Sequence, residues 1–159
     1  MKTLVVYYSR DGLTKKTALS LADLLQADNE ELIDLTNRRG IWGWLFAGRD
    51  AMKRKLTRLK PTEKRPENYD LVVIGSPVWA DNVTPAVRTY LSEHAGQIKR
   101  AAFFCSKGGS PAKNLFPEMA AAAGGLKPLA TLEIKEADDK TGAATHKILQ
   151  FVAEIKQSA

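Results

Sequence analysis

The stretch T-L-V-V-Y-Y-S-R-D-G-L-T at residues 3–14 decides the fold of this 159-residue chain. Its apolar first half predicts a buried strand over Thr3–Tyr8, and its polar second half predicts a turn. The apolar spacing of Ala18, Leu21 and Leu25 then predicts a helix with one face toward a core. A strand that leads directly into a helix is the repeating unit of α/β proteins.

Similar strand-like runs recur along the chain. We expect strands at Thr3–Tyr8, Glu31–Leu35, Leu71–Gly75, Ala101–Cys105 and Ala130–Ile134. The first, third and fourth runs are apolar throughout, which is typical of strands buried on both faces of a parallel sheet. The second and fifth are more polar and suit positions nearer the edges. The sequence therefore predicts one α/β domain over residues 1–159, a five-stranded parallel sheet with helices on both faces.

Helix starts and apolar faces are also predicted. Thr84-Pro85 and Ser110-Pro111 each combine an N-cap residue with a proline suited to the first helical position. The C-terminal helix is expected to turn four apolar residues toward the core: Ile148, Leu149, Val152 and Ile155.

The net charge of +6 is concentrated in one stretch, residues 38–65, which we call the basic segment. It holds ten basic and two acidic residues, so the rest of the chain is slightly acidic. A basic amphipathic helix is predicted over residues 41–59, with an aromatic start and a stripe of apolar residues. The aromatic residues are Trp42, Trp44 and Phe46, and the stripe is Leu45, Met52, Leu56 and Leu59.

Four interpretations of the basic segment stay open. The first is an ordinary crossover helix with a solvated face, and the second is a docking site for an acidic redox partner. The third is a site for the phosphates of NADPH, and the fourth is a contact with an anionic membrane surface. Nucleic-acid binding is not expected, because the remaining surface is slightly acidic and no nucleic-acid-binding motif is present.

Few side chains suggest that the protein catalyses a reaction without a cofactor. No apolar run is long enough to span a bilayer, and no signal-peptide pattern is present, so we expect a cytoplasmic protein. Cys105 is the only cysteine and ends a buried strand, which predicts an inert thiol in the core. His94 and His146 stand alone, and no metal-ligand spacing or catalytic residue is expected.

Three polar loops follow the first, third and fourth predicted strands. They read S-R-D-G-L-T at 9–14, S-P-V-W-A-D-N at 76–82 and S-K-G-G-S at 106–110. In a parallel sheet the carboxyl ends of such strands meet in one crevice, where ligands bind. The first loop is either a phosphate site at a helix start or an ordinary turn in which Asp11 caps the helix.

These loops resemble those of flavodoxins and flavodoxin-like flavoproteins, over nearly the whole chain. The similar stretches are Y-Y-S-R-D-G-L-T at 7–14, G-S-P-V-W-A-D-N-V-T-P-A-V-R at 75–88 and F-C-S-K-G-G-S at 104–110. The resemblance implies a flavodoxin-like three-layer sandwich, a sheet of order 2-1-3-4-5, and FMN as cofactor. The residues implied to hold FMN are Ser9, Arg10, Asp11, Gly12, Leu13 and Thr14 at the phosphate, Ser76, Pro77, Val78, Trp79, Ala80 and Asn82 on one side of the ring, and Ser106, Lys107, Gly108 and Gly109 on the other.

The first loop departs from the usual family pattern at two positions. Asp11 stands where Thr or Ser is usual, and Leu13 stands where Asn is usual. Flavodoxin-like protoporphyrinogen oxidases have a similar T-R-D-G-Q-T loop, so Asp at this position is compatible with FMN. We therefore expect a phosphate site, with Asp11 facing away from the phosphate to cap the helix. Lys107, if close to the flavin ring, is expected to raise its reduction potential.

The resemblance implies a redox protein that carries one or two electrons. Its partner is expected to be a redox protein or a small-molecule electron acceptor. Alternatives are an NAD(P)H-dependent quinone or flavin reductase and an enzyme like protoporphyrinogen oxidase. An alternative of another class is a flavin-free interaction module that uses the basic segment. The sequence leaves a homodimer open.

Overall fold

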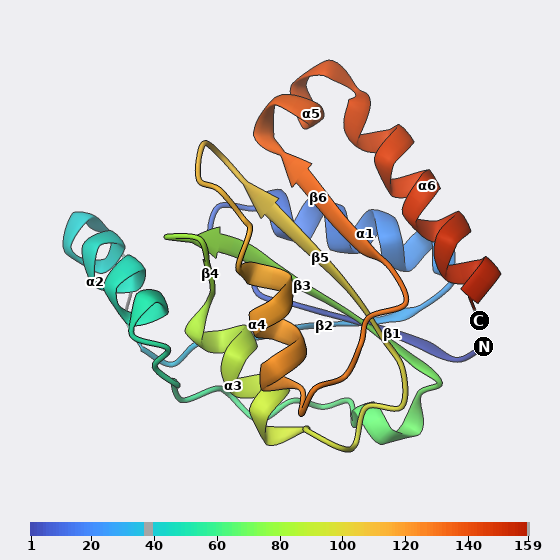
Figure 1. The fold of residues 1–159 in the computed structure, drawn as a ribbon, viewed down its shortest axis with the longest axis horizontal. Coiled ribbons are helices and arrows are strands. Elements are labelled where there is room, and N and C mark those ends of the chain that lie inside the picture. Colours follow the sequence, from blue (N-terminus) through green and yellow to red (C-terminus); the bar gives the residue numbers. More distant parts are fainter. Residues whose placement is uncertain (37–39, 159) are drawn as a thin grey trace.

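The computed structural model describes residues 1–36 and 40–158 and has three layers, a twisted sheet between two sets of helices (Figure 1). The sheet has the order β2-β1-β3-β5-β6, and each neighbouring pair along this path is parallel. These strands are β1 (Thr3–Tyr7), β2 (Asp28–Glu31), β3 (Leu71–Trp79), β5 (Ala101–Lys107) and β6 (Thr131–Lys135). This is the predicted 2-1-3-4-5 order, to which a short strand β4 (Asn82–Val83) is added antiparallel to the end of β3.

Helices cover both faces of the sheet. Residues of α1 (Leu13–Leu25) and α6 (Ala143–Ser158) share one apolar core with the sheet, and those of α3 (Pro85–Glu93) and α4 (Leu115–Ala122) share the other. The remaining elements are α2 (Gly40–Met52), a 3₁₀ turn at Pro66–Asn68 and α5 (Glu136–Thr141). Figure 1 shows α2 set apart from the two main layers, and α5 beyond the carboxyl end of β6.

The centre of the sheet is tightly packed. Residues Leu71–Ile74 of β3 and Ala101–Cys105 of β5 are fully buried, as expected for strands covered on both faces. Gly75 continues β3 opposite Phe104, and a β-carbon added at Gly75 would stand 2.0 Å from the Phe104 ring. The ring of Phe104 therefore occupies the space that any other residue at position 75 would need.

The predicted second strand is wrong in position. The strand runs over Asp28–Glu31, whose side chains are polar and not fully buried, and the more apolar stretch 31–35 follows it. Leu32 enters the core, while the backbone around Ile33 and Leu35 pairs with residues 58–60. The apolar pattern of this stretch therefore reflects one buried leucine and a second, irregular pairing.

Two helix predictions are also corrected. Ser110-Pro111 does not start α4, which begins at Leu115 after Asn114. In α6, Leu149 is 49% exposed and Phe151 is buried instead. Thr84-Pro85 does start α3, with the proline in its first turn.

The basic segment forms a shorter helix than predicted. α2 ends at Met52 with the hydrogen bonds of a Schellman motif, in which the amides of Arg54 and Lys55 donate to the carbonyls of Ala51 and Asp50. Arg54 takes the left-handed conformation, with φ of 53°, that this motif requires. Leu56 and Leu59 therefore do not extend a helical stripe. Arg38, Arg39 and the side chains of Trp42, Trp44 and Leu45 lie outside the described residues.

We predict that Gly75→Ala lowers the free energy of unfolding by about 1–3 kcal/mol or more, because the added methyl group forces Phe104 out of its position. Urea denaturation measures this change. Gly48→Ala is the matched control, since apart from the adjacent residues and backbone of α2 itself no described atom lies within 4 Å of the added β-carbon. It should leave stability unchanged or slightly raised, because alanine favours a helix. Equal stability of the Gly75→Ala variant and the unmodified protein would contradict the packing argument.

Candidate functional site

The turn between β1 and α1 is built around Ser9 and Gly12. Gly12 has φ of 94°, a conformation that favours glycine, and it precedes the first residue of α1. Ser9 Oγ accepts hydrogen bonds from the amides of Gly12 and Lys15, both at 3.2 Å. The amides of Leu13 and Thr14 begin the helix, where no earlier helical carbonyl can accept from them. The turn therefore gathers backbone donors around an acceptor oxygen.

Asp11 does not cap the helix, contrary to our expectation. Gly12, which has no side chain, occupies the N-cap position, and the first-turn amide of Lys15 donates to Ser9 Oγ instead. The Asp11 side chain is 88% exposed and lies 3.9 Å from Arg10 Nε. Its carboxylate is therefore well solvated, which weakens its repulsion of an anion at the amides.

Trp79 lies at the end of a strand, not in a loop. β3 continues through residues 76–79, and a two-residue turn at Ala80 and Asp81 returns the chain into β4. Both turn residues have left-handed backbone, with φ of 49° and 61°, as tight hairpins require. The Trp79 ring packs edge-on against Tyr8, with ring centroids 5.7 Å apart. The β3–β4 hairpin thus holds the indole on a regular, hydrogen-bonded element.

The third loop is tied to the first by a buried hydrogen bond. Thr14 Oγ1 and Ser106 Oγ lie 2.6 Å apart, and both residues are buried. Lys107, the last residue of β5, forms an ion pair with Glu133 of β6 at 2.7 Å. Its side chain is only 12% exposed, so the ammonium is held against the sheet and does not reach into solvent.

The three stretches converge on a cleft of about 700 Å³, which we call the loop cleft. Of the predicted site residues, the cleft is lined by Arg10, Asp11, Gly12, Leu13, Thr14, Pro77, Val78, Trp79, Ser106, Lys107 and Gly108. Ser9, Ser76, Ala80, Asn82 and Gly109 do not line it. Ser76 is fully buried, and its hydroxyl lies 3.2 Å from that of Thr84 below the hairpin.

Four lining residues were not predicted: Lys16, Glu136, Asp139 and Lys140. Lys16 lies one helical turn after Gly12, so the helical period could have indicated it. The other three belong to α5, directly after β6, where the carboxyl-end rule also applies. Lys16 pairs with Asp139 at 2.7 Å and Lys140 pairs with Glu136 at 2.7 Å. These charges largely compensate one another, which leaves the backbone amides of α1 as the main donors for an anion.

Cys105 lies in the core, as predicted. It is fully buried in β5, and burial, with the nearby Glu133 carboxylate, raises the pKa of its thiol to about 12. The thiol therefore stays protonated at neutral pH and is a poor nucleophile. Among the residues that the structure describes, no helix combines the length and apolar character that crossing a bilayer requires.

The fold and the loop cleft define a class of doubly wound α/β proteins with a ligand crevice where the strand order reverses, between β1 and β3. The sequence profile of the family described as flavodoxin matches residues 2–129. The chain therefore belongs to the flavodoxin family.

Solved structures have the same fold. A flavoprotein from Lactobacillus acidophilus in complex with FMN is 23% identical, with a TM-score of 0.70 over 91% of this chain and 98% of that chain. Flavodoxin 1 from Bacillus cereus is 20% identical, with a TM-score of 0.57 over 99% and 98%. General stress protein 14 from Treponema denticola, in complex with FMN, is 12% identical, with a TM-score of 0.59 over the full length of both chains. A comparison with curated proteins gives no match.

Proposed function

We propose that the loop cleft binds FMN and that the protein carries electrons between redox partners. The main support is that the donors at the start of α1 line the same cleft as Trp79 and the backbone of Gly108. One end of the cleft suits a phosphate and the other suits a flat ring. Two of the proteins with similar structures are described in complex with FMN.

The phosphate would be held without a dedicated cation. A helix start offers free amides and the positive end of the helix dipole, which together favour an anion. Ser9 Oγ already serves as an acceptor for two of these amides, at 3.2 Å. Phosphate oxygens would take over this role, which leaves the Ser9 hydroxyl free to donate. The open space around the Gly12 Cα lets a ligand approach the backbone closely.

The ring would lie between Trp79 and the third loop. A flavin supplies one- or two-electron chemistry when bound, and the protein sets its orientation and potential. Trp79 offers a flat apolar surface whose orientation is fixed by Tyr8. On the other side, Ser106 is fixed through its contact with Thr14, so the wall and the phosphate turn move together.

The titratable residues that line the cleft favour a carrier over an enzyme. Among the described residues that line the cleft, there is no histidine or cysteine, and its lysines form ion pairs with carboxylates. A bound flavin exchanges electrons without a catalytic side chain, so a cleft of this composition suits a carrier. The basic segment would serve a carrier as a docking surface for an acidic protein partner, because opposite charges speed association.

We predict that the protein binds FMN at least about 100-fold more tightly than riboflavin, because charge-assisted hydrogen bonds to the phosphate each contribute roughly 1.5–3 kcal/mol. Quenching of flavin fluorescence measures both affinities. Trp79→Ala should weaken the binding of both FMN and riboflavin. Asp11→Ala, which changes an exposed side chain, should not weaken the binding of FMN. Equal affinity for FMN and riboflavin would rule out a phosphate site.

We predict that NADPH reduces the FMN-loaded protein no faster than it reduces free FMN, because a carrier receives electrons from a protein partner. Stopped-flow absorbance of the oxidised flavin measures the rate, and dithionite provides the fully reduced reference. Saturable oxidation of NADPH would instead identify a reductase and refute the carrier assignment, while leaving FMN binding intact.

We predict opposite shifts of the reduction potential for the two members of the Lys107–Glu133 pair. Lys107→Met leaves the Glu133 carboxylate unpaired beside the cleft and should lower the potential, because negative charge disfavours added electrons. Glu133→Gln should raise it, and the double variant should lie near the unmodified protein. Spectroelectrochemistry with bound FMN measures all three. A potential unchanged in both single variants would exclude this pair from tuning the flavin.

A further inference from the structure

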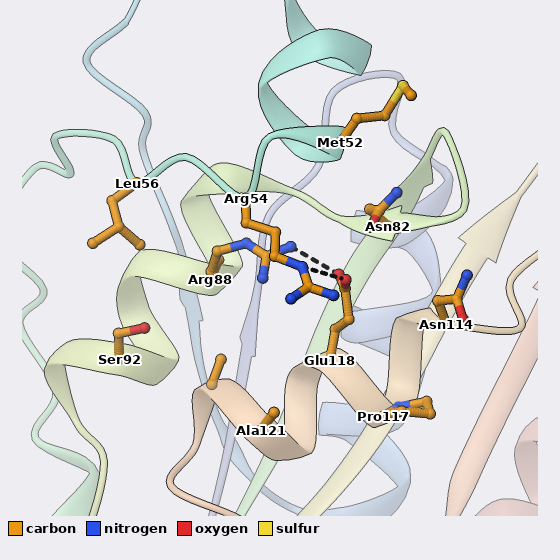
Figure 2. A pocket seen from close by; sticks show the side chains of 11 residues that line it. Met52, Arg54, Leu56, Asn82, Arg88, Ser92, Asn114, Pro117, Glu118 and Ala121 are labelled. Carbon is orange, nitrogen blue, oxygen red and sulfur yellow. Dashed lines mark hydrogen bonds and ion pairs between the residues drawn. The ribbon is translucent and has the colours of Figure 1, made fainter.

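A second cavity, of about 670 Å³, lies between α3, α4 and the chain that follows α2. Figure 2 shows its residues: Arg54, from the chain after α2, and Arg88, from α3, both point toward Glu118 on α4. The other lining residues are Met52, Leu56, Asn82, Ser92, Asn114, Pro117, Ala121 and Ala122. We call it the arginine cavity. None of its residues lines the loop cleft.

The centre of the arginine cavity is a charged triad. Arg88 Nη2 donates to Glu118 Oε2 at 2.8 Å, and Arg54 Nε donates to Glu118 Oε1 at 3.1 Å. Arg88 is 7% exposed and Glu118 is 8% exposed, so two of the three groups are withdrawn from water. The Arg54 side chain is 70% exposed and closes the triad from the solvent side.

The triad carries one uncompensated positive charge. It has two guanidinium groups and one carboxylate, and the other lining residues are uncharged. In addition, Arg88 Nε is buried and has no hydrogen-bond acceptor among the described residues. The spare positive charge is that of the exposed Arg54, since the buried Arg88 and Glu118 neutralise each other. A net positive charge attracts a further anion, and leaving the buried Arg88 Nε donor unused is costly. A bound monoanion would give alternating charges with a net charge of zero.

The walls of the cavity indicate that the anion has an apolar part. Met52 is 66% exposed and Leu56 is 59% exposed, and both stand at the cavity. Pro117, Ala121 and Ala122 form an apolar wall on α4. A hydrocarbon group in contact with these residues would remove apolar surface from water. Asn82 and Asn114 add neutral polar side chains to the lining.

Arg54 is fixed in place by the backbone. It occupies the left-handed position that ends α2, where glycine is usual, and its side chain reaches Glu118 on α4. A purely structural ion pair would also explain this contact. It would not explain why the charges are unequal or why the cavity beside them has exposed apolar walls.

We propose that the arginine cavity is a binding site for a small organic monoanion, a carboxylate on an apolar body, held by Arg54 and Arg88. This proposal does not depend on the flavin assignment. The site adjoins the β3–β4 hairpin, because Asn82, which lines the cavity, is the cross-strand partner of Trp79.

Benzoate is a suitable probe, and benzyl alcohol is its uncharged counterpart. Titration of ¹⁵N-labelled protein, with and without excess FMN, should give saturable benzoate shifts centred on the amides of Arg54, Arg88 and Glu118. Benzyl alcohol should bind at least about tenfold more weakly, since it cannot pair with the guanidinium groups. Benzoate shifts that disappear when FMN is added would place the ligand in the loop cleft and overturn the proposal.

Three variants separate a built site from general attraction to a basic surface. Arg54→Ala should lower the affinity for benzoate about tenfold, whereas Lys53→Ala, which removes the same charge one residue away, should leave this affinity unchanged. Arg88→Met combined with Glu118→Met removes the buried pair without leaving a lone charge, so this variant is expected to fold. It should abolish binding. Benzoate binding that survives in this variant, or that weakens equally in Lys53→Ala, would refute the site.

Discussion

Parallel pairing of β1, β3 and β5 is the constraint on which the rest of the molecule depends. The pairs Thr3 with Leu71 and Val72 with Ala101 start a register in which the three strands run side by side in one direction. Their carboxyl ends must then meet at one edge of the sheet. The phosphate turn, Trp79 and the third loop are neighbours for this reason, although up to about a hundred residues separate them. The hydrogen bond between Thr14 and Ser106 secures this arrangement at its centre.

The sequence was sufficient to predict the central strands of the sheet but not the edge strand β2. Apolar runs such as L-V-V-I identify strands that are covered on both faces, because nearly every side chain there is buried. β2 gives no such signal: within residues 1–36 and 40–158 it pairs with β1 alone, and its side chains bind polar partners. Tyr69 donates to Asp28, and Lys15 pairs with Glu31. An edge strand defined by polar contacts to distant residues has no local apolar pattern to detect.

The candidate site also has parts that the sequence predicts and parts that it does not. Gly12, Trp79 and Gly108 were predicted from loops that follow strands, because topology alone brings such loops together. The conformation of the second loop was not predictable, since residues 76–82 form a hairpin only through a turn with two left-handed non-glycine residues. The triad of Arg54, Arg88 and Glu118 was equally hidden. Arg88 and Arg54 lie 30 and 64 residues from Glu118 in the sequence, and each of the three resembles an ordinary charged residue on a helix or loop.

The β3–β4 hairpin contributes residues to both the loop cleft and the arginine cavity. Trp79 faces the loop cleft, its cross-strand partner Asn82 lines the arginine cavity, and Asp81 at the tip is anchored to Asn114 at 2.7 Å. Because Trp79 and Asn82 face each other across the two strands, one short element supplies a wall to both the loop cleft and the arginine cavity.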